Sequence, residues 1–476
     1  MNRYPLRPAL FVFFFFLASL VAAASPQSDD GVVKILAIGN SFSADAIENN
    51  LWDLASEKGI KTVVANLYIG GAPLHLHVTN ARENKPAYSY RKTDVAGNRT
   101  TVTEVSLEKA LADEDWDYVS FQQASPLSGQ FKTVADFLPE LAQYVRGKLK
   151  NPNAKFIYHQ TWAYSEHAVH PGFANYDRDQ RKMYQAIVDV SKQVHSIAPI
   201  DIVIPAGTAI QNARTSYIGD NFDRDGYHLR FSLGRYVAAC TWFEKIFGVP
   251  VIGLKYKPAD VTETEKLVAQ YAAHYAVEKP YEVTPLKKFR KGPKPLKKPA
   301  AAVLVDFGGV SHEGVWNPIV SPLAGKIHPL RDSLLNPTRI ALEMVKGFEG
   351  KNSDGDRNPV PESGFPGSVT NAGYFGKGGQ ESQFRLTGLD KKSLYDISFY
   401  AARDGENLGV LETSVVCEGA EKTEAIVNIA NKSSRKGNFQ GVRPAADGTI
   451  TLTVKAGPRN GSEGFYCISA LRLEAK

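Results

Sequence analysis

The segment 34–43, KILAIGNSFS, constrains the fold of this chain more than any other stretch. Its first five residues are mostly apolar and predict a buried strand, which Gly39 and Asn40 then interrupt. Apolar residues behind the interruption recur at helical spacing and predict one helix that Gly59 ends. Those residues are Ile47, Leu51, Leu54 and Ala55. Ser41 is therefore expected on a sharp turn between a strand and a helix.

A hydroxyl at this position lies at the carboxyl end of a strand and beside a helix N-terminus. The N–H groups there have no partner within the helix and favour developing negative charge. A nucleophile for acyl transfer needs such surroundings. A serine that only caps the helix is the alternative reading of this stretch.

The first 24 residues read as a secretory leader. Arg3 and Arg7 precede a phenylalanine-rich apolar run, and Ala22, Ala23 and Ala24 offer a small-residue cleavage site. The run is short for a bilayer span, and no later stretch is long and apolar enough to form one. The mature protein is therefore expected to be secreted or periplasmic, with a retained N-terminal anchor as the alternative.

Chain length and charge indicate how many domains the chain has and where they are joined. The chain has 476 residues, more than one hydrophobic core serves, so two domains are expected. The net charge of +6 does not point to nucleic acid, because much of it lies in the leader and in one short segment. That segment, 286–300, is basic and contains prolines, which predicts a linker between domains at 25–285 and 301–476.

The two domains differ in pattern. Short apolar runs alternate with helical patterns from 32 to 281, which predicts an α/β domain with a mainly parallel sheet. Expected strands are 61–68, 116–121, 155–159 and 200–205, with a hairpin within 79–103. After the linker, alternating strands such as 303–307, 383–386, 395–399 and 449–454 predict an all-β sandwich.

The sequence DGYH at 225–228 is the second informative stretch. An Asp three residues before a His, on a tight turn, can bond the imidazole Nδ1 and leave Nε2 available as a general base. With Ser41, these two residues complete a nucleophile, a base and an orienting carboxylate. Alone, the pair is common enough to be an ordinary surface feature.

These blocks together resemble the SGNH (GDSL-like) hydrolase superfamily. The resemblance rests on GNSFS at 39–43, Gly70-Gly71 after the second strand, and DGYH at 225–228. It implies a three-layer α/β/α fold, with Ser41 as nucleophile, His228 as base and Asp225 as its orienter. It also implies an oxyanion hole built from the backbone N–H groups of Ser41 and of Gly70 or Gly71, and from one further amide side chain.

Two positions depart from the superfamily pattern. Asn40 stands where an Asp usually precedes the nucleophile. The Gly-x-Asn-Asp block is absent, and Gln122-Gln123 stands in its place. Because a glutamine amide donates the same kind of hydrogen bond, Gln122 or Gln123 is expected to complete the oxyanion hole.

Further candidates are weaker. His159, Gln160 and Trp162 follow the fourth strand, where open sheets bind ligands, and with Asn40 they are candidate substrate-binding residues. No metal is expected, because no carboxylate or cysteine joins the histidines at ligand spacing. The loop with Asn352, Asp354, Asp356 and Asn358 is read as an ordinary polar loop rather than a calcium site. Cys417 and Cys467 leave a disulfide and free thiols equally open.

The sequence thus predicts an exported serine esterase that removes acyl groups, with acetyl expected, from a glycan and needs no cofactor. The C-terminal part resembles jelly-roll-type sandwiches attached to exported carbohydrate-active enzymes. A glycan-binding protein without activity and a lipase or phospholipase of the same superfamily are the alternatives. The oligomeric state has no sequence signal.

Overall fold

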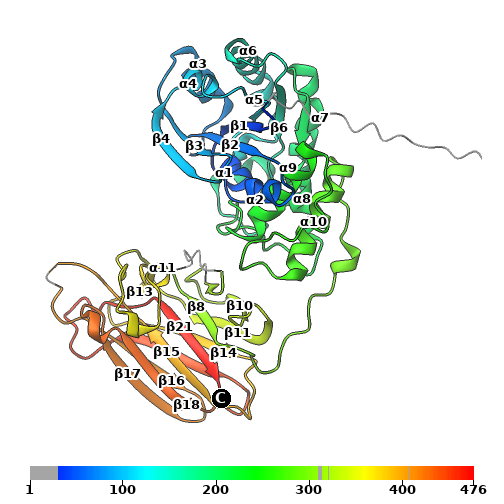
Figure 1. Ribbon diagram of the computed structural model, residues 1–476. Coiled ribbons are helices and arrows are strands. Elements are labelled where there is room, and N and C mark those ends of the chain that lie inside the picture. The colour runs from blue at the N-terminus through cyan, green and yellow to red at the C-terminus, as the bar shows by residue number, and fades with distance from the viewer. Residues whose placement is uncertain (1–29, 309–313, 320, 407) are drawn as a thin grey trace, which may run out of the picture.

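A computed structural model describes residues 30–308, 314–319, 321–406 and 408–476. The expected leader, residues 1–24, lies outside the described residues. Figure 1 shows an N-terminal α/β part, coloured blue to green, and a C-terminal all-β part, coloured yellow-green to red. The fold class expected from the sequence is therefore confirmed. Within the described residues, no helix combines the length and the apolar character that crossing a bilayer requires.

The α/β part is built on one seven-stranded sheet in the order β4-β3-β2-β1-β5-β6-β7. Its parallel strands are β1 (Val33–Gly39), β2 (Thr62–Tyr68), β5 (Tyr118–Phe121), β6 (Lys155–His159) and β7 (Ile202–Ile204). The antiparallel hairpin of β3 (Tyr88–Thr93) and β4 (Arg99–Val105) extends the edge at β2. Because parallel strands end on one side, the segments after β1, β2, β5 and β6 meet there.

Helices cover both faces of this sheet, as the alternation of β1 requires. Ile35 and Ala37 pack into one buried cluster, whereas Leu36 and Ile38 pack into another. The first cluster contains α1 (Ser41–Ile47), α2 (Leu51–Glu57), α8 (Ala206–Arg214), α9 (Leu233–Phe247) and α10 (Glu263–Glu278). The second contains α3 (Leu74–Arg82), α4 (Leu107–Leu111) and α6 (Leu138–Lys148), and α5 (Phe131–Ala135) adds Val134 to it. The helix α7 (Gln180–Ile197) contributes to both clusters.

The structure corrects two local expectations and adds two helices that the sequence did not predict. The single helix expected after Ser41 is two helices, because α1 ends at Ile47 and α2 starts only at Leu51. The hairpin expected within 79–103 is preceded by α3, whose Leu74, Val78 and Ala81 are buried at helical spacing. The helices α8 and α10 carry no expectation from the sequence, although Thr262 and Glu265 form a capping box at the start of α10.

The all-β part packs two main sheets around one core. The larger sheet has the order β10-β11-β14-β19-β16-β17, the second β18-β15-β21-β8-β9, and a small third sheet β12-β13-β20. Both main sheets contribute to the same buried cluster. The strands are β8 (Val303–Asp306), β9 (Asn317–Pro318), β10 (Ile327–Arg331), β11 (Pro337–Lys346), β12 (Gly350–Asn352), β13 (Gly373–Gly376), β14 (Glu381–Thr387), β15 (Tyr395–Tyr400), β16 (Glu412–Glu418), β17 (Lys422–Asn428), β18 (Lys436–Val442), β19 (Ile450–Ala456), β20 (Tyr466–Ile468) and β21 (Ala470–Ala475). One short helix, α11 (Gly367–Thr370), precedes β13.

The basic segment between the two parts packs at both of its ends. Leu286 and Phe289 belong to the buried cluster of the α/β part. Further along, the N–H of Leu296 donates to the carbonyl of Pro337 at 2.8 Å, at the start of β11. Arg331 also forms an ion pair with Glu265 of α10 at 3.2 Å. The segment 286–300 is therefore anchored at both ends.

Candidate active site

The local sequence places Ser41 at the first position of α1. Asn40 caps the helix, because its side-chain Oδ1 accepts a hydrogen bond from the N–H of Phe42 at 3.0 Å. A Cβ at position 39 would lie 2.4 Å from the Ser43 hydroxyl oxygen and 3.1 Å from the Gln122 side chain, so Gly39 is required by close approach. The Ser41 N–H is one of the helix N–H groups without an intrahelical acceptor.

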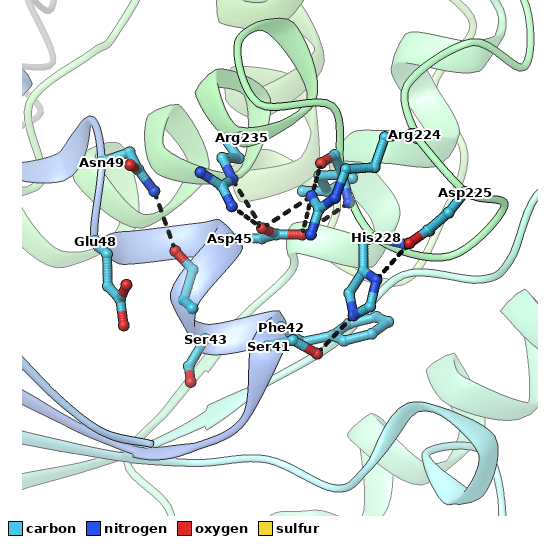
Figure 2. A network of polar contacts seen from close by, with 12 residues as sticks. Ser41, Phe42, Ser43, Asp45, Glu48, Asn49, Arg224, Asp225, His228 and Arg235 are labelled. Carbon is cyan, nitrogen blue, oxygen red and sulfur yellow. Dashed lines mark hydrogen bonds and ion pairs between the residues drawn. The ribbon is translucent and has the colours of Figure 1, made fainter. Parts of the chain in front are cut away.

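The loop that precedes α9 brings a histidine to this serine. His228 Nε2 lies 2.8 Å from Ser41 Oγ, and His228 Nδ1 lies 2.7 Å from Asp225 Oδ2 (Figure 2). The structure thus brings Ser41, His228 and Asp225 together across 187 residues. A serine, an imidazole and a carboxylate in such a chain can perform nucleophilic acyl transfer.

Asp225 is held in its ionised form by its own turn. Its Oδ1 accepts hydrogen bonds from the backbone N–H groups of Tyr227 at 3.2 Å and His228 at 2.8 Å. Partial burial opposes ionisation, but the bonds from the His228 ring and backbone outweigh it and hold the pKa of Asp225 below its ordinary value. Gly226, with φ of +93°, allows this turn, and a Cβ there would lie 2.9 Å from Ala168 Cα.

A second carboxylate, Asp45, binds the residue next to the histidine. Asp45 lies one turn after Ser41 on α1 and is 1% exposed. Its Oδ2 accepts from the backbone N–H of Leu229 at 2.8 Å, and it forms ion pairs with Arg224 at 3.1 Å and Arg235 at 2.7 Å. Figure 2 shows Asp45 between these two arginines, beside the His228 loop.

Aromatic packing fixes the opposite side of the same turn. Trp162 stacks on Phe42 with ring centres 4.3 Å apart, and its Nε1 donates to the Tyr227 carbonyl at 2.8 Å. The Tyr227 ring lies 4.1 Å from the His228 ring. The Ser165 N–H donates to the Gly226 carbonyl at 2.8 Å. The turn 225–228 is consequently held between α1 and the segment after β6.

The two glutamines do not lie as the sequence predicts. Gln123 accepts from the N–H groups of Leu74 and Ala124, and its amide nitrogen donates to Thr133. Both ends of its amide are therefore hydrogen-bonded within the protein, and the amide does not point toward an oxyanion. The expected oxyanion role of Gln123 is therefore corrected to a packing role.

Gln122 is also buried, at 1% exposure, and serves Asn40 rather than an open site. Its amide nitrogen donates to Asn40 Oδ1 at 2.7 Å, and its oxygen lies 2.9 Å from His159 Nδ1. A direct oxyanion contact from Gln122 is thus not supported. The sequence cannot reveal these partners, because they lie 82 and 37 positions away along the chain.

The candidate substrate-binding residues after β6 are interior. His159 and Gln160 are fully buried and Trp162 is 1% exposed. Burial lowers the pKa of His159 to about 3, so its ring is neutral at physiological pH. Gln160 accepts from the N–H of Thr208 at 3.0 Å. Direct sugar contact by these three residues is therefore corrected to a packing role, and Asn40, at 1% exposure, is likewise a structural neighbour of the site.

The glycine loop after β2 remains beside the serine turn. Gly70 and Gly71 are exposed, and Gly71 has a φ of +66°. The Ile69 N–H donates to the Gly39 carbonyl at 3.2 Å, which continues the β1–β2 pairing up to this loop. The backbone N–H groups of Ser41, Gly70 and Gly71 are thus the candidate oxyanion donors that keep an open position.

Three sets of candidates from the sequence remain: the metal ligands, the polar loop of the all-β part, and the cysteines. Within the described residues, no group of three or more His, Cys, Asp or Glu side chains is arranged to hold a metal ion. In the loop with Asn352, Asp354, Asp356 and Asn358, the fully buried Asp356 accepts from Arg435 at 2.6 Å and Tyr400 at 2.8 Å. Cys240, Cys417 and Cys467 are free and buried.

Sequence reasoning missed Asp45, Arg224 and Arg235. One signal was present, since Ser41 and Asp45 are four residues apart on a helix and therefore lie on one face. The basic partners gave none, because Arg224 and Arg235 lie 179 and 190 positions from Asp45.

Comparisons with known proteins match the α/β part. A family model described as "Domain of unknown function (DUF4886)" matches residues 34–276. No curated protein has a matching sequence. The crystal structure of a DUF4886 family protein from Bacteroides uniformis is 49% identical, with a TM-score of 0.53, and the match covers 54% of this chain and 99% of that one.

Two further solved structures are more distant. Axe2, an acetylxylan esterase from Geobacillus stearothermophilus, is 13% identical with a TM-score of 0.33, over 49% of this chain and 99% of its own. TmCBM61, solved in complex with beta-1,4-galactotriose, is 12% identical with a TM-score of 0.18, over 28% of this chain and 82% of its own. Because both TM-scores are low, neither structure is used to assign a site or an activity.

Proposed function

The chain belongs to the DUF4886 family, and from the geometry of its site we propose that it is a serine esterase of SGNH type. The single observation that carries this proposal is the hydrogen-bonded series from Asp225 through His228 to Ser41, with distances of 2.7 and 2.8 Å. This arrangement supplies a nucleophile, a base and an orienting carboxylate from the chain's own residues.

In the proposed reaction, Ser41 Oγ attacks the ester carbonyl carbon while His228 Nε2 takes its proton. The tetrahedral intermediate places negative charge on the former carbonyl oxygen, which the Ser41 and Gly70 or Gly71 N–H groups would stabilise. His228 then delivers the proton to the leaving alcohol oxygen, and the acyl group stays on Ser41. Water, activated by the same imidazole, hydrolyses the acyl-enzyme.

Asp225 would serve in both half-reactions by stabilising the imidazolium and fixing the ring tautomer. Its lowered pKa keeps it ionised throughout the neutral range, as that role demands. Asp225→Asn should therefore lower kcat less than His228→Ala, because the base itself is retained in the first variant.

The proposed substrate is an acylated glycan, with acetyl as the expected acyl group, and the proposed location is outside the cytoplasm. Export is supported by the leader-like sequence at 1–24. An open position at Gly70 and Gly71, which are exposed, suits an ester carried on a large polymer.

Acetate release from a panel of acetylated polysaccharides tests the proposal, with Ser41→Ala as the control. The wild-type protein should release acetate, and the variant should release none. A protein that binds the polymers without releasing acetate would instead be the inactive glycan-binding alternative. Release of long-chain fatty acids from lipid emulsions, without acetate release from glycans, would favour a lipase.

A further inference from the structure

The His228 turn does not by itself determine where its imidazole lies relative to Ser41. Within the described part of the chain, the hydrogen bonds that the Asp225 carboxylate accepts all come from Tyr227 and His228 of the same turn. The Asp225–His228 pair is therefore a self-contained unit. Its position above α1 is set by contacts with the backbone of the turn, where Trp162 and Ser165 bind, and with the backbone beside it.

Asp45 makes the contact that joins this unit to the helix of the nucleophile. The carboxylate accepts from the Leu229 N–H at 2.8 Å, one residue after the histidine. Ser41 and Asp45 lie four residues apart, so one face of α1 bears both the nucleophile and the anchor of the base. A shift of α1 consequently carries the Ser41 hydroxyl and the Leu229 anchor together.

Two arginines stabilise the buried Asp45 carboxylate and connect it to α9 and to the His228 loop. Arg235 of α9 bonds Asp45 through Nε at 2.8 Å and through its terminal nitrogen at 2.7 Å. Arg224, on the loop itself, pairs with Asp45 and also donates to the carbonyl of Leu229. The two guanidinium groups flank the Phe231 ring at 4.5 and 4.6 Å.

The burial of Asp45 determines how much its ion pairs with Arg224 and Arg235 matter. Asp45 is 1% exposed, and the side chains of Arg224 and Arg235 are 22% and 16% exposed. An ionised carboxylate at such depth is stable only when charges and N–H donors surround it, so removing the carboxylate leaves two guanidinium groups without their partner. The network therefore has one favourable arrangement, which fixes the backbone at Leu229.

We propose that Asp45, with Arg224 and Arg235, is a positioning unit that sets the reach of His228 to Ser41 in the proposed esterase reaction. This inference rests on the proposed function and names residues that assist it without touching substrate. A misplaced base affects the chemical step more than substrate binding, because proton transfer depends steeply on geometry.

The test compares Asp45→Asn with the matched control Glu244→Gln. Glu244 is a buried carboxylate on α9 that also accepts a backbone N–H, from Val251 at 2.9 Å, and bonds a basic side chain, His274, at 2.6 Å. Among the described residues, its hydrogen bonds and ion pair are made with Val251 and His274, away from the His228 loop. Thermal unfolding of both variants and kcat and KM for a small acetyl ester are measured together, with labelling of Ser41 by a serine-directed phosphonate.

Asp45→Asn is expected to lower kcat and the labelling rate about 10²-fold while KM stays within about twofold. Glu244→Gln is expected to lower the unfolding temperature comparably and to keep kcat. Asp45→Glu, which retains the charge, is expected to recover part of kcat. If Asp45→Asn does not fold, the same comparison is made with Arg235→Lys, for which a smaller loss of kcat is expected.

Three outcomes separate the possible failures. Wild-type kcat in a folded Asp45→Asn overturns the positioning role while leaving the esterase proposal intact. Equal losses of kcat in Asp45→Asn and Glu244→Gln overturn it too, because the effect would then follow stability alone. A wild-type protein that neither hydrolyses the ester nor accepts the label at Ser41 overturns the proposed function, and the positioning role with it.

Discussion

The side-chain nitrogen of Asn40 donates a hydrogen bond to the carbonyl of Ala72 at 3.0 Å and so joins two segments that border the nucleophile. Asn40 caps the helix that begins with Ser41, and Ala72 directly follows Gly70 and Gly71. The candidate oxyanion donors thus belong to the start of α1 and to the glycine loop, which one amide side chain holds together. An Asp at this position would lack the donor for Ala72.

Asn40→Ala should impair stability and catalysis together. Losing a helix cap costs about 1 kcal/mol of unfolding free energy, and loss of the Ala72 bond should also lower kcat by freeing the glycine loop. Urea unfolding and ester kinetics check this. Ser106→Ala is the control, because Ser106 caps α4 through the N–H of Lys109 at 3.3 Å. A kcat equal in both variants would contradict the link between Asn40 and the oxyanion donors.

Gln122→Ala should act through stability rather than through the oxyanion. The variant would leave Asn40 Oδ1 and His159 Nδ1 without the glutamine as a partner in the interior, at a cost of about 1–3 kcal/mol. Its kcat should fall much less than the roughly 10²-fold typical of a lost oxyanion donor. Chemical unfolding and kcat are the measurements. A 10²-fold loss of kcat with unchanged stability would reinstate Gln122 as a direct donor.

The pH dependence of stability should show one half-buried carboxyl near the active-site turn. Burial raises the pKa of Asp223 to about 6, against the opposing effect of Arg214. Because the folded state binds this proton more tightly than the unfolded state, the contribution of Asp223 to stability is present below about pH 4 and is lost as the pH rises through about 6.

Asp223→Asn should therefore stabilise the protein above pH 6 and change little near pH 4. Asparagine keeps the acceptor for the Gly226 N–H, which Asp223 Oδ1 binds at 2.7 Å. The expected gain at neutral pH is on the order of 2 kcal/mol. Unfolding free energies between pH 4 and 8 test this. An equal effect of the substitution at every pH would show that Asp223 does not titrate in this range.

Local patterns in the sequence carry much of the fold and part of the site. The strands β1, β2 and β6 are apolar runs that end in glycine or polar residues, and Ser41, Asp225 and His228 belong to short blocks in which spacing alone suggests chemistry. Tertiary partners decide the rest. The amides of Gln122 and Gln123 and the ring of His159 are taken up by distant residues, and the pairing of Asp45 with Arg224 and Arg235 depends on the packing of α1 against α9.

Removal of the all-β part should leave the chemistry of small esters intact. The candidate triad lies before residue 230, but Leu286 and Phe289 pack into the α/β core, so the cut belongs after Arg290. We expect unchanged kcat for a soluble acetyl ester and slower acetate release from insoluble glycan, because the attached part raises the local concentration of the enzyme. Both rates are compared with those of the full chain.

Loss of small-ester activity in a folded truncated protein would show that the all-β part, which is joined to α10 by the ion pair between Glu265 and Arg331, completes the site. Unchanged release from insoluble glycan would contradict a targeting role.

The most direct test of the account is intact-protein and peptide mass spectrometry after treatment with a serine-directed phosphonate. A nucleophilic Ser41, bonded to His228 at 2.8 Å, should take one phosphonyl group, and the adduct should map to the peptide that contains Ser41. His228→Ala should react far more slowly. A folded wild-type protein whose Ser41 remains unmodified, or an adduct on another serine, would contradict the proposed esterase.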